Sequence, residues 1–173
     1  GHRKKVTLMR FHPTASNVLA STSADYTVKT WDIEMGEEIS TYADFGDNLI
    51  QDIVWDVRGE KYAVSCKDKS VRFIDPRTGT LSNSITSAHD GLKSVKCAYL
   101  GTTGKFLTTG TSRQREVKIW DLKNLSQPLH TESLDTASGA LLPLFDNDTN
   151  VLYLCSKGSG IITPYEFEDK APF

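Results

Sequence analysis

A histidine, a serine and an aspartate near the N-terminus are the first residues that could do chemistry. His2, Ser21 and Asp25 are the residue types of a nucleophilic triad, and Trp31 follows them. The spacing favours another arrangement, because Asp25 precedes Trp31 by six residues and Ser21 precedes Asp25 by four. This suits a hairpin with Asp25 in its tight turn and with Ser21 and Trp31 on its strands. We therefore interpret the four residues as a hydrogen-bonded structural tetrad, with no catalytic residue among them.

Two later segments repeat part of this pattern. Asp68 again stands six residues before an apolar strand residue, Ile74, but neither a loop histidine nor a tryptophan accompanies it. His89 and Trp120 are present further on, although the turn at residues 112–115 carries no aspartate. These segments predict partial tetrads, so we expect a complete set only near the N-terminus.

Other motifs that resemble chemical sites do not meet the requirements of those sites. Residues 101–105 contain a Gly-Lys pair but are too short for a phosphate-binding loop, and they lie between two expected strands. Residues 146–150 begin like a calcium loop, yet Lys157 stands where a bidentate glutamate is required. Three widely spaced cysteines form neither a zinc motif nor a disulfide framework: Cys66, Cys97 and Cys155. We expect no metal and no cofactor.

The elements that would position these residues are short strands. Runs rich in Val, Ile, Thr, Phe and Tyr recur between Gly, Asp, Asn and Ser, and helix signals are nearly absent. Strong strands end at Trp31-Asp32, Ile74-Asp75, Trp120-Asp121 and Tyr165-Glu166, at intervals of 43, 46 and 45 residues. A period in the mid-forties that ends in Trp-Asp is typical of a four-stranded β-propeller blade.

We therefore predict an all-β chain, a WD40-type β-propeller fragment of about four blades built from antiparallel four-stranded sheets. The repeats cover about 1–43, 44–86, 87–133 and 134–173 of one partial propeller. The last repeat offers only three strands, so its outer strand is expected to be missing. The first and last blades should then expose apolar faces, and two copies could associate through them as a homodimer.

Charge and hydropathy narrow the classes of partner. The 173 residues carry 20 Lys and Arg against 22 Asp and Glu, a formal net charge of −2. This balance argues against nucleic-acid binding and against a polybasic membrane anchor. No apolar run approaches the length that spans a bilayer, so we expect a cytoplasmic protein without membrane insertion.

Basic residues fall in the loops that enter each first strand and in the turns between second and third strands. Such residues could be no more than solvated turn residues, or they could form a docking surface for an acidic protein. A third possibility is an adaptor that recognises a peptide or phosphopeptide. The candidate partner-binding residues are Arg3, Lys4, Lys5, Lys67, Lys69, Lys93, Arg113 and Arg115, with Lys157 on the same side.

The segments between the repeated strands resemble coronins, the actin-associated propeller proteins. The similarity runs through residues 11–19, 67–80 and 107–121 and ends at Ala171-Pro172-Phe173. The fourth repeat is the most diagnostic, because residues 134–158 differ from generic Trp-Asp repeats but look like a coronin blade.

The resemblance implies a segment of a seven-bladed ring and a scaffold that binds actin filaments at the cell cortex, within the actin cytoskeleton. It also implies that the protein acts together with branching and severing factors in filament turnover. An enzyme of propeller fold is the alternative from another class, but the inward strand positions Leu8, Ile53 and Val95 offer only apolar groups. We therefore expect a non-catalytic interaction scaffold that regulates actin dynamics.

Overall fold

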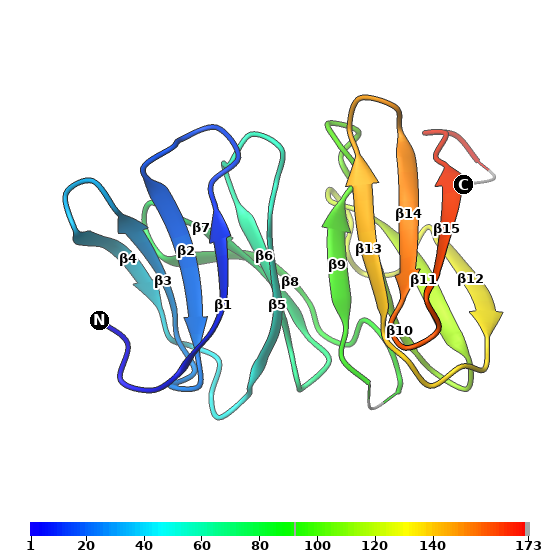
Figure 1. Cartoon of the computed structure of the whole chain (residues 1–173), viewed down its shortest axis with the longest axis horizontal. Coiled ribbons are helices and arrows are strands. Elements are labelled where there is room, and N and C mark those ends of the chain that lie inside the picture. Colours follow the sequence, from blue (N-terminus) through cyan, green and yellow to red (C-terminus); the bar gives the residue numbers. More distant parts are fainter. Residues whose placement is uncertain (92, 172–173) are drawn as a thin grey trace. The chain divides into compact units, whose positions relative to one another are not determined.

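The computed structural model describes residues 1–91 and 93–171, and within them it contains fifteen strands and no helix (Figure 1). The predicted C-terminal motif ends at Pro172 and Phe173, which lie outside the described residues. The chain divides into two compact units, Gly1–Thr86 and Ser87–Phe173, and each holds two antiparallel sheets.

The first unit contains two four-stranded sheets in which neighbouring strands follow the order of the chain. We call them sheet A and sheet B. Sheet A consists of β1 (Val6–Phe11), β2 (Val18–Ser23), β3 (Val28–Asp32) and β4 (Glu37–Tyr42). Sheet B consists of β5 (Ile50–Trp55), β6 (Tyr62–Cys66), β7 (Val71–Asp75) and β8 (Thr80–Ile85).

The second unit pairs a four-stranded sheet with a three-stranded one. Sheet C consists of β9 (Lys96–Tyr99), β10 (Lys105–Thr111), β11 (Arg115–Asp121) and β12 (His130–Asp135). Sheet D consists of β13 (Leu141–Asp146), β14 (Val151–Ser156) and β15 (Ile161–Glu166). The all-β prediction is confirmed, as is the missing outer strand of the last blade.

In sheets A and B, the tight turn between the second and third strands owes its shape to an aspartate. In sheet A, Asp25 Oδ1 accepts hydrogen bonds from the Thr27 backbone N–H and hydroxyl, and Tyr26 between them has φ 66°. In sheet B, Asp68 binds Ser70 in the same way around Lys69, whose φ is 71°. The aspartate side chain thus holds a non-glycine residue in the left-handed region, at the position that the repeat predicted.

Each unit buries an apolar core formed by facing sides of its two sheets. In the first unit, Ala20 and Val28 of sheet A belong to one cluster with Ile53, Tyr62 and Ile74 of sheet B. In the second unit the corresponding cluster joins sheet C to sheet D. Sheet C contributes Leu107, Val117 and Ile119 from β10 and β11 and Leu100 from the loop after β9, and sheet D contributes Leu141, Leu152 and Leu154. The alternation of side chains along each strand therefore leaves the opposite faces of sheets A and D outside these cores.

Those opposite faces carry exposed apolar side chains. Met9 and Phe11 of β1 are 59% and 66% exposed, and Leu144 of β13 and Ile162 of β15 are both 63% exposed. Among the described residues, none forms a helix long and apolar enough to cross a membrane. Over the same part of the chain, no cluster of three or more His, Cys, Asp or Glu residues is arranged to hold a metal ion.

Candidate functional site

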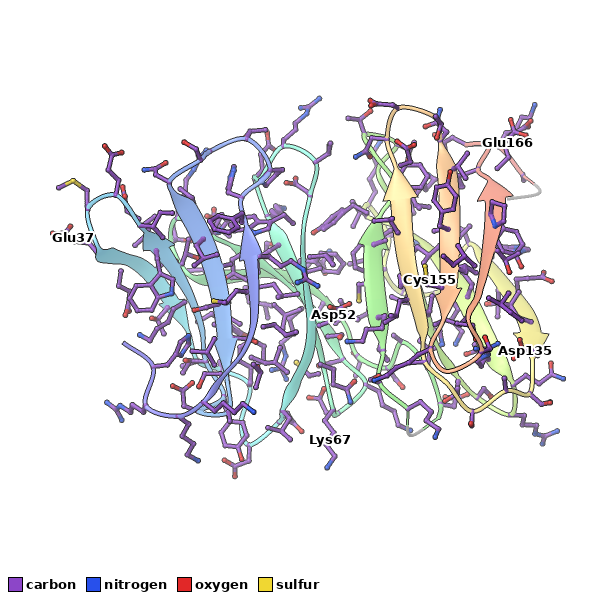
Figure 2. The ribbon with its side chains drawn as sticks, viewed as in Figure 1. Glu37, Asp52, Lys67, Asp135, Cys155 and Glu166 are labelled. Carbon is purple, nitrogen blue, oxygen red and sulfur yellow. The ribbon has the colours of Figure 1, made fainter. Side chains whose placement is uncertain are left out.

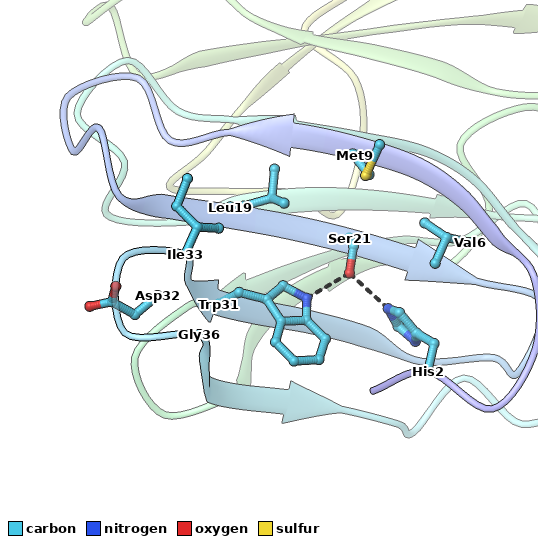
Figure 3. Close-up of a pocket in the computed structure, with 9 residues that line it drawn as sticks. All are labelled: His2, Val6, Met9, Leu19, Ser21, Trp31, Asp32, Ile33 and Gly36. Atoms are coloured by element: carbon cyan, nitrogen blue, oxygen red, sulfur yellow. Dashed lines mark hydrogen bonds between the residues drawn. The ribbon is translucent and has the colours of Figure 1, made fainter.

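Three of the predicted tetrad residues of sheet A, namely His2, Ser21 and Trp31, lie together in Figure 3. Ser21 Oγ lies 2.8 Å from His2 Nε2 and accepts a hydrogen bond of 2.8 Å from the indole N–H of Trp31. His2 Nδ1 lies 3.2 Å from Asp25 Oδ2. Because a carboxylate only accepts, a neutral His2 donates to Asp25 from Nδ1 and accepts the Ser21 hydroxyl at Nε2.

Asp25 anchors the loop that leads into β1. Its Oδ2 accepts the Arg3 backbone N–H at 2.7 Å, while its Oδ1 holds the Thr27 turn. Partial burial raises the pKa of Asp25, but hydrogen bonds from Thr27 and Arg3, together with the nearby His2, lower it more, so that it lies well below its ordinary value. The carboxylate therefore stays charged and keeps the N-terminal loop attached to the sheet.

A shallow pocket of about 420 Å³ opens beside this tetrad on the exposed face of sheet A (Figure 3). Its wall is mainly apolar, with Met9, Leu19 and Ile33 around the Trp31 ring. Ser21 is buried and its oxygen already has two partners, so it is not placed as a free nucleophile. The hydrogen bonds of these four residues join the entry loop, the turn and two strands of sheet A.

Sheet B builds the same region with an apolar side chain. Phe45 stands 23 residues before Asp68, as His2 stands 23 before Asp25, and it is fully buried in the core cluster with Ile74. Asp68 forms an ion pair of 3.1 Å with Arg72, whose guanidinium lies over the Phe45 ring at 5.0 Å. The sequence showed that the polar set was incomplete but did not identify Phe45 as its replacement.

Sheet C contains a second complete tetrad, and the prediction of a partial one is wrong. His89 Nε2 lies 2.8 Å from Thr108 Oγ1, which accepts a hydrogen bond of 3.0 Å from the Trp120 indole N–H. The other ring nitrogen, Nδ1, lies 2.8 Å from Glu116 Oε1. Thr108 thus takes the place of the serine, and Glu116 takes the place of the aspartate. Glu116 lies on strand β11, whereas Asp25 of the first tetrad lies in the turn between β2 and β3.

This second tetrad is more deeply buried than the first. His89 is 1% exposed, and Gly110 is required beside it because a Cβ there would lie 2.4 Å from the ring. Burial lowers the pKa of His89, although the hydrogen bond to Glu116 opposes the shift. Lys118 Nζ forms an ion pair with Glu116 at 3.2 Å and donates to the Ala88 carbonyl, which holds the preceding loop residue in place.

Arg115 is not a surface residue, which corrects its assignment to the partner-binding set. It is 5% exposed, and its guanidinium forms a two-pronged ion pair with Asp135. It also donates to the Gly139 carbonyl and to Ser156 Oγ, so it joins sheet C to sheet D. Asp135 further raises the pKa of Arg115, and the guanidinium lowers the pKa of Asp135. We therefore remove Arg115 from the docking surface.

The other basic candidates lie in loops at the ends of the sheets. In the first unit the Lys5 carbonyl accepts the Ala24 N–H, and the Lys67 N–H donates to the Leu49 carbonyl, which places both residues where an entry loop meets a turn. Figure 2 shows Lys67 projecting from such a turn. In the second unit a bond of 2.6 Å from Gly91 to Thr111 joins the corresponding segments, which carry the exposed side chains of Lys93 and Arg113.

The other members of the basic set differ in their surroundings. Arg3 and Lys4 are exposed, and Lys4 Nζ lies 5.3 Å from the centre of the Tyr26 ring. Lys69 is half-buried in the turn that Asp68 holds, and Lys157 is exposed.

Comparison with known proteins gives consistent matches. The model of the family "WD domain, G-beta repeat" matches residues 1–32 and 79–121. "Coronin-like protein crn1" of Schizosaccharomyces pombe is 41% identical over 172 residues, which is 98% of this chain and 28% of that protein. Human "Coronin-2A" is 39% identical over 178 residues, covering 99% of this chain and 34% of that protein. The chain thus spans about a third or less of these relatives.

Solved structures agree. The crystal structure of the WD40 domain from Toxoplasma gondii coronin superposes with a TM-score of 0.90 at 32% identity, over 96% of this chain and 43% of that one. The computationally designed Ika4 protein, at 19% identity and a TM-score of 0.71, matches 97% of this chain and 94% of its own, and it shows the fold alone. With its Trp-Asp repeats, its four antiparallel sheets and these relatives, the chain is a WD-repeat propeller fragment of the coronin family.

Proposed function

We propose that the chain is part of a protein-interaction scaffold of the coronin type, which binds actin filaments and regulates their dynamics without chemistry of its own. The observation that carries the proposal is the similarity to coronins along nearly the whole chain. The resemblance to coronins implies an actin-associated propeller, so actin filaments are the proposed partner. The proposal includes branching and severing factors as further partners, and a location at the cell cortex within the cytoplasmic actin cytoskeleton.

The candidate contact residues are the basic side chains at the loop ends. In the first unit these are Arg3, Lys4, Lys5, Lys67 and Lys69, and in the second unit they are Lys93 and Arg113. All of these residues except the half-buried Lys69 are exposed, and exposed positive charges attract an acidic protein surface and speed its association, an effect that weakens as salt rises. The polar tetrads contribute by holding the entry loops that carry these residues.

Cosedimentation with filamentous actin tests the proposal, with both the 173-residue chain and the longer protein to which it belongs. We expect Lys67→Glu combined with Arg113→Glu to weaken binding by roughly threefold to tenfold, since each exposed ion pair contributes up to about 1 kcal/mol. Arg58→Glu is the matched control, because Arg58 is exposed in the turn after β5, at the opposite end of sheet B from Lys67.

Binding should also fall steadily between 50 and 200 mM salt, because added salt shortens the Debye length and screens charges that are farther apart than this length. The electrostatic surface would be removed from the proposal if the longer protein bound actin equally well at all salt concentrations and with both Lys67→Glu and Arg113→Glu. The alternative, an adaptor for a peptide or phosphopeptide, would appear as binding to an immobilised peptide array that depends on the same two residues.

The exposed apolar faces of sheets A and D support a proposed homodimer. Met9 and Leu144 are the kind of large exposed apolar side chains that favour association. Light scattering at micromolar concentration should give a mass near twice 19.2 kDa, and Met9→Glu should reduce it. A monomer mass throughout that range would contradict this part of the proposal.

A further inference from the structure

The turn between β14 and β15 carries an exposed serine, Ser159. Residues 157–160 form this turn, with the sequence Lys-Gly-Ser-Gly, and all four are exposed. Ser156, directly before the turn, pairs with Leu141, the first residue of β13. The turn therefore lies at the end of sheet D where β13 begins (Figure 1).

A fourth strand does not cover a turn of this kind. In sheets A, B and C the fourth strand ends opposite Val28, Val71 and Arg115, which are the first residues of the third strands. The turn before each of these residues lies beyond the paired strands. In sheet D the pairing of β14 with β15 likewise stops at Ile161. Access to Ser159 therefore does not depend on how many strands the sheet has.

The Ser159 hydroxyl is less committed to the fold than the hydroxyls in the corresponding turns of the first unit. Thr27 in sheet A and Ser70 in sheet B each donate their hydroxyl to an aspartate at 2.6 Å, and Ser70 is only 8% exposed. The Ser159 hydroxyl makes longer contacts, a donation of 3.2 Å to the Ser156 carbonyl and an acceptance of 3.4 Å from the Ile161 N–H. Modifying it therefore costs the turn little.

Two glycines give this turn conformational freedom. Gly158 and Gly160 have φ values of 90° and 67°, and a Cβ built on either would have no atom within 4 Å. In sheets A and B an aspartate side chain fixes the turn instead. Because the glycines are free of tight contacts, the turn can change its shape to enter the groove of an enzyme.

The charge around Ser159 is positive. Lys157 precedes it by two residues and is exposed. Arg115 donates to the Ser156 hydroxyl, directly before the turn, and it follows the exposed Arg113 by two residues. Lys157 and Arg113 therefore lie at the same end of the second unit. A basic side chain two residues before a serine is a feature that an acidic substrate groove recognises.

We propose that Ser159 is a phosphorylation site for a serine kinase that selects a basic residue ahead of its substrate serine. The Ser159 hydroxyl oxygen attacks the γ-phosphorus of Mg-ATP and forms an O–P bond, while the bond from that phosphorus to the β,γ-bridging oxygen breaks and ADP leaves. The hydroxyl proton passes to the catalytic base of the kinase. The phosphoserine carries a charge of about −1.5 to −2, which outweighs the charge of Lys157.

Phosphorylation would then reverse the charge at this end of the second unit. The consequence for binding rests on the proposed function, in which Lys93 and Arg113 attract an acidic filament surface. Because the phosphate repels such a surface, phosphorylation should weaken actin binding by about threefold to tenfold at 50 mM salt. The effect should be smaller at 200 mM salt, since salt screens exposed charges.

Tandem mass spectrometry of the 173-residue chain, after incubation with Mg-ATP and a serine kinase directed to basic sequences, tests the site. We expect phosphate on Ser159 and none on Thr27 or Ser70. Lys157→Gln should slow the modification about fivefold or more. Lys123→Gln is the matched control and should not, because Lys123 is exposed in the loop after β11, at the other end of sheet C. A chain without phosphate on Ser159, or equal rates for the parent and Lys157→Gln, would overturn the proposal.

Cosedimentation with filamentous actin, using the longer protein to which the chain belongs, tests the consequence. Ser159→Asp should weaken binding about twofold or more, and Ser159→Ala should bind like the parent. Thr102→Asp adds the same charge in the exposed turn between β9 and β10, at the other end of sheet C, and should have no effect. Equal binding by Ser159→Asp and Thr102→Asp would overturn the regulation. A protein that is phosphorylated on Ser159 but never binds actin would instead support the modification site and refute the proposed function.

Discussion

Replacing Thr108 by Val should destabilise the second unit more than any other change that removes a single hydroxyl there. Val has the shape of Thr but no hydroxyl, so the fully buried site keeps its packing. Two groups lose their partner at once, His89 Nε2 and the Trp120 indole N–H, and both residues are buried. An unpaired buried polar group costs about 1–3 kcal/mol, so the loss for the two groups should be about 2–6 kcal/mol.

The neighbouring Thr109 gives a matched control. It is equally buried, but its hydroxyl donates a single hydrogen bond of 2.7 Å, to the Leu141 carbonyl. Thr109→Val should therefore cost about 1–2 kcal/mol. Thr108→Ser retains the hydroxyl and should recover most of the loss, apart from about 1 kcal/mol for the missing methyl group.

Equilibrium urea unfolding followed by tryptophan fluorescence measures these differences. Trp120 reports on the second unit, while Trp31 and Trp55 report on the first, so a circular dichroism transition is needed alongside it. A stability of about 5–15 kcal/mol makes a loss of this size easy to resolve. The reasoning fails if Thr108→Val costs no more than Thr109→Val, or if Thr108→Ser is as damaging as Thr108→Val.

Three further predictions concern other buried groups. Because burial lowers the pKa of His89, the unfolded chain binds a proton that the folded chain does not as pH falls. The free energy of unfolding should therefore fall as pH drops from about 6.5. Urea titrations at pH 7 and 5.5 measure this pH dependence, which Thr108→Val should alter. Arg115→Lys should lower the urea midpoint of the second unit, since it loses the two-pronged pair with Asp135, while Arg113→Glu should leave the midpoint unchanged; equal midpoints would contradict the placement of Arg115. Burial raises the pKa of Cys66 to about 12, so mass spectrometry after mild iodoacetamide treatment should find the half-buried Cys155 alkylated first and Cys66 last, and early labelling of Cys66 would mean that sheet B opens readily.

The sheets could be predicted because the repeat signal comes from many residues. Strand ends at Asp32, Asp75, Asp121 and Glu166 follow from the mid-forties period, and β3, β7, β11 and β15 do end there. The strand starts do not follow from this period, as β12 shows, which begins at His130. The Leu129 N–H already bonds to the Ile119 carbonyl, so pairing starts before the regular ladder that defines the strand.

The errors around Arg115 and Glu116 have one physical cause. A fixed offset from Trp120 puts the turn at residues 112–115, as in sheet A, but β10 and β11 already pair from Thr111 and Arg115 onward. Side chains alternate between the two faces of a sheet only along a strand, so a residue that is assigned to a turn is not assigned to either face. Once the register is known, Gly110 lies opposite Glu116, next to the ring of His89. A glutamate following a basic residue in a turn gave no signal of this from the sequence alone.

Sheets A, B and C show that an entry loop can be attached to its sheet in two ways. His2 and His89 use polar tetrads, whose partners differ in type and in position along the chain. Phe45 uses apolar burial beside Ile74 instead. A buried polar set and a well-packed apolar set of similar volume can stabilise a fold about equally, so the exchange need not weaken the blade. What the loop requires is a residue that fills the site between the second strand and the turn. The motif of Ser, His, Asp and Trp identifies one chemical solution, and its absence from a repeat therefore does not predict a loose loop.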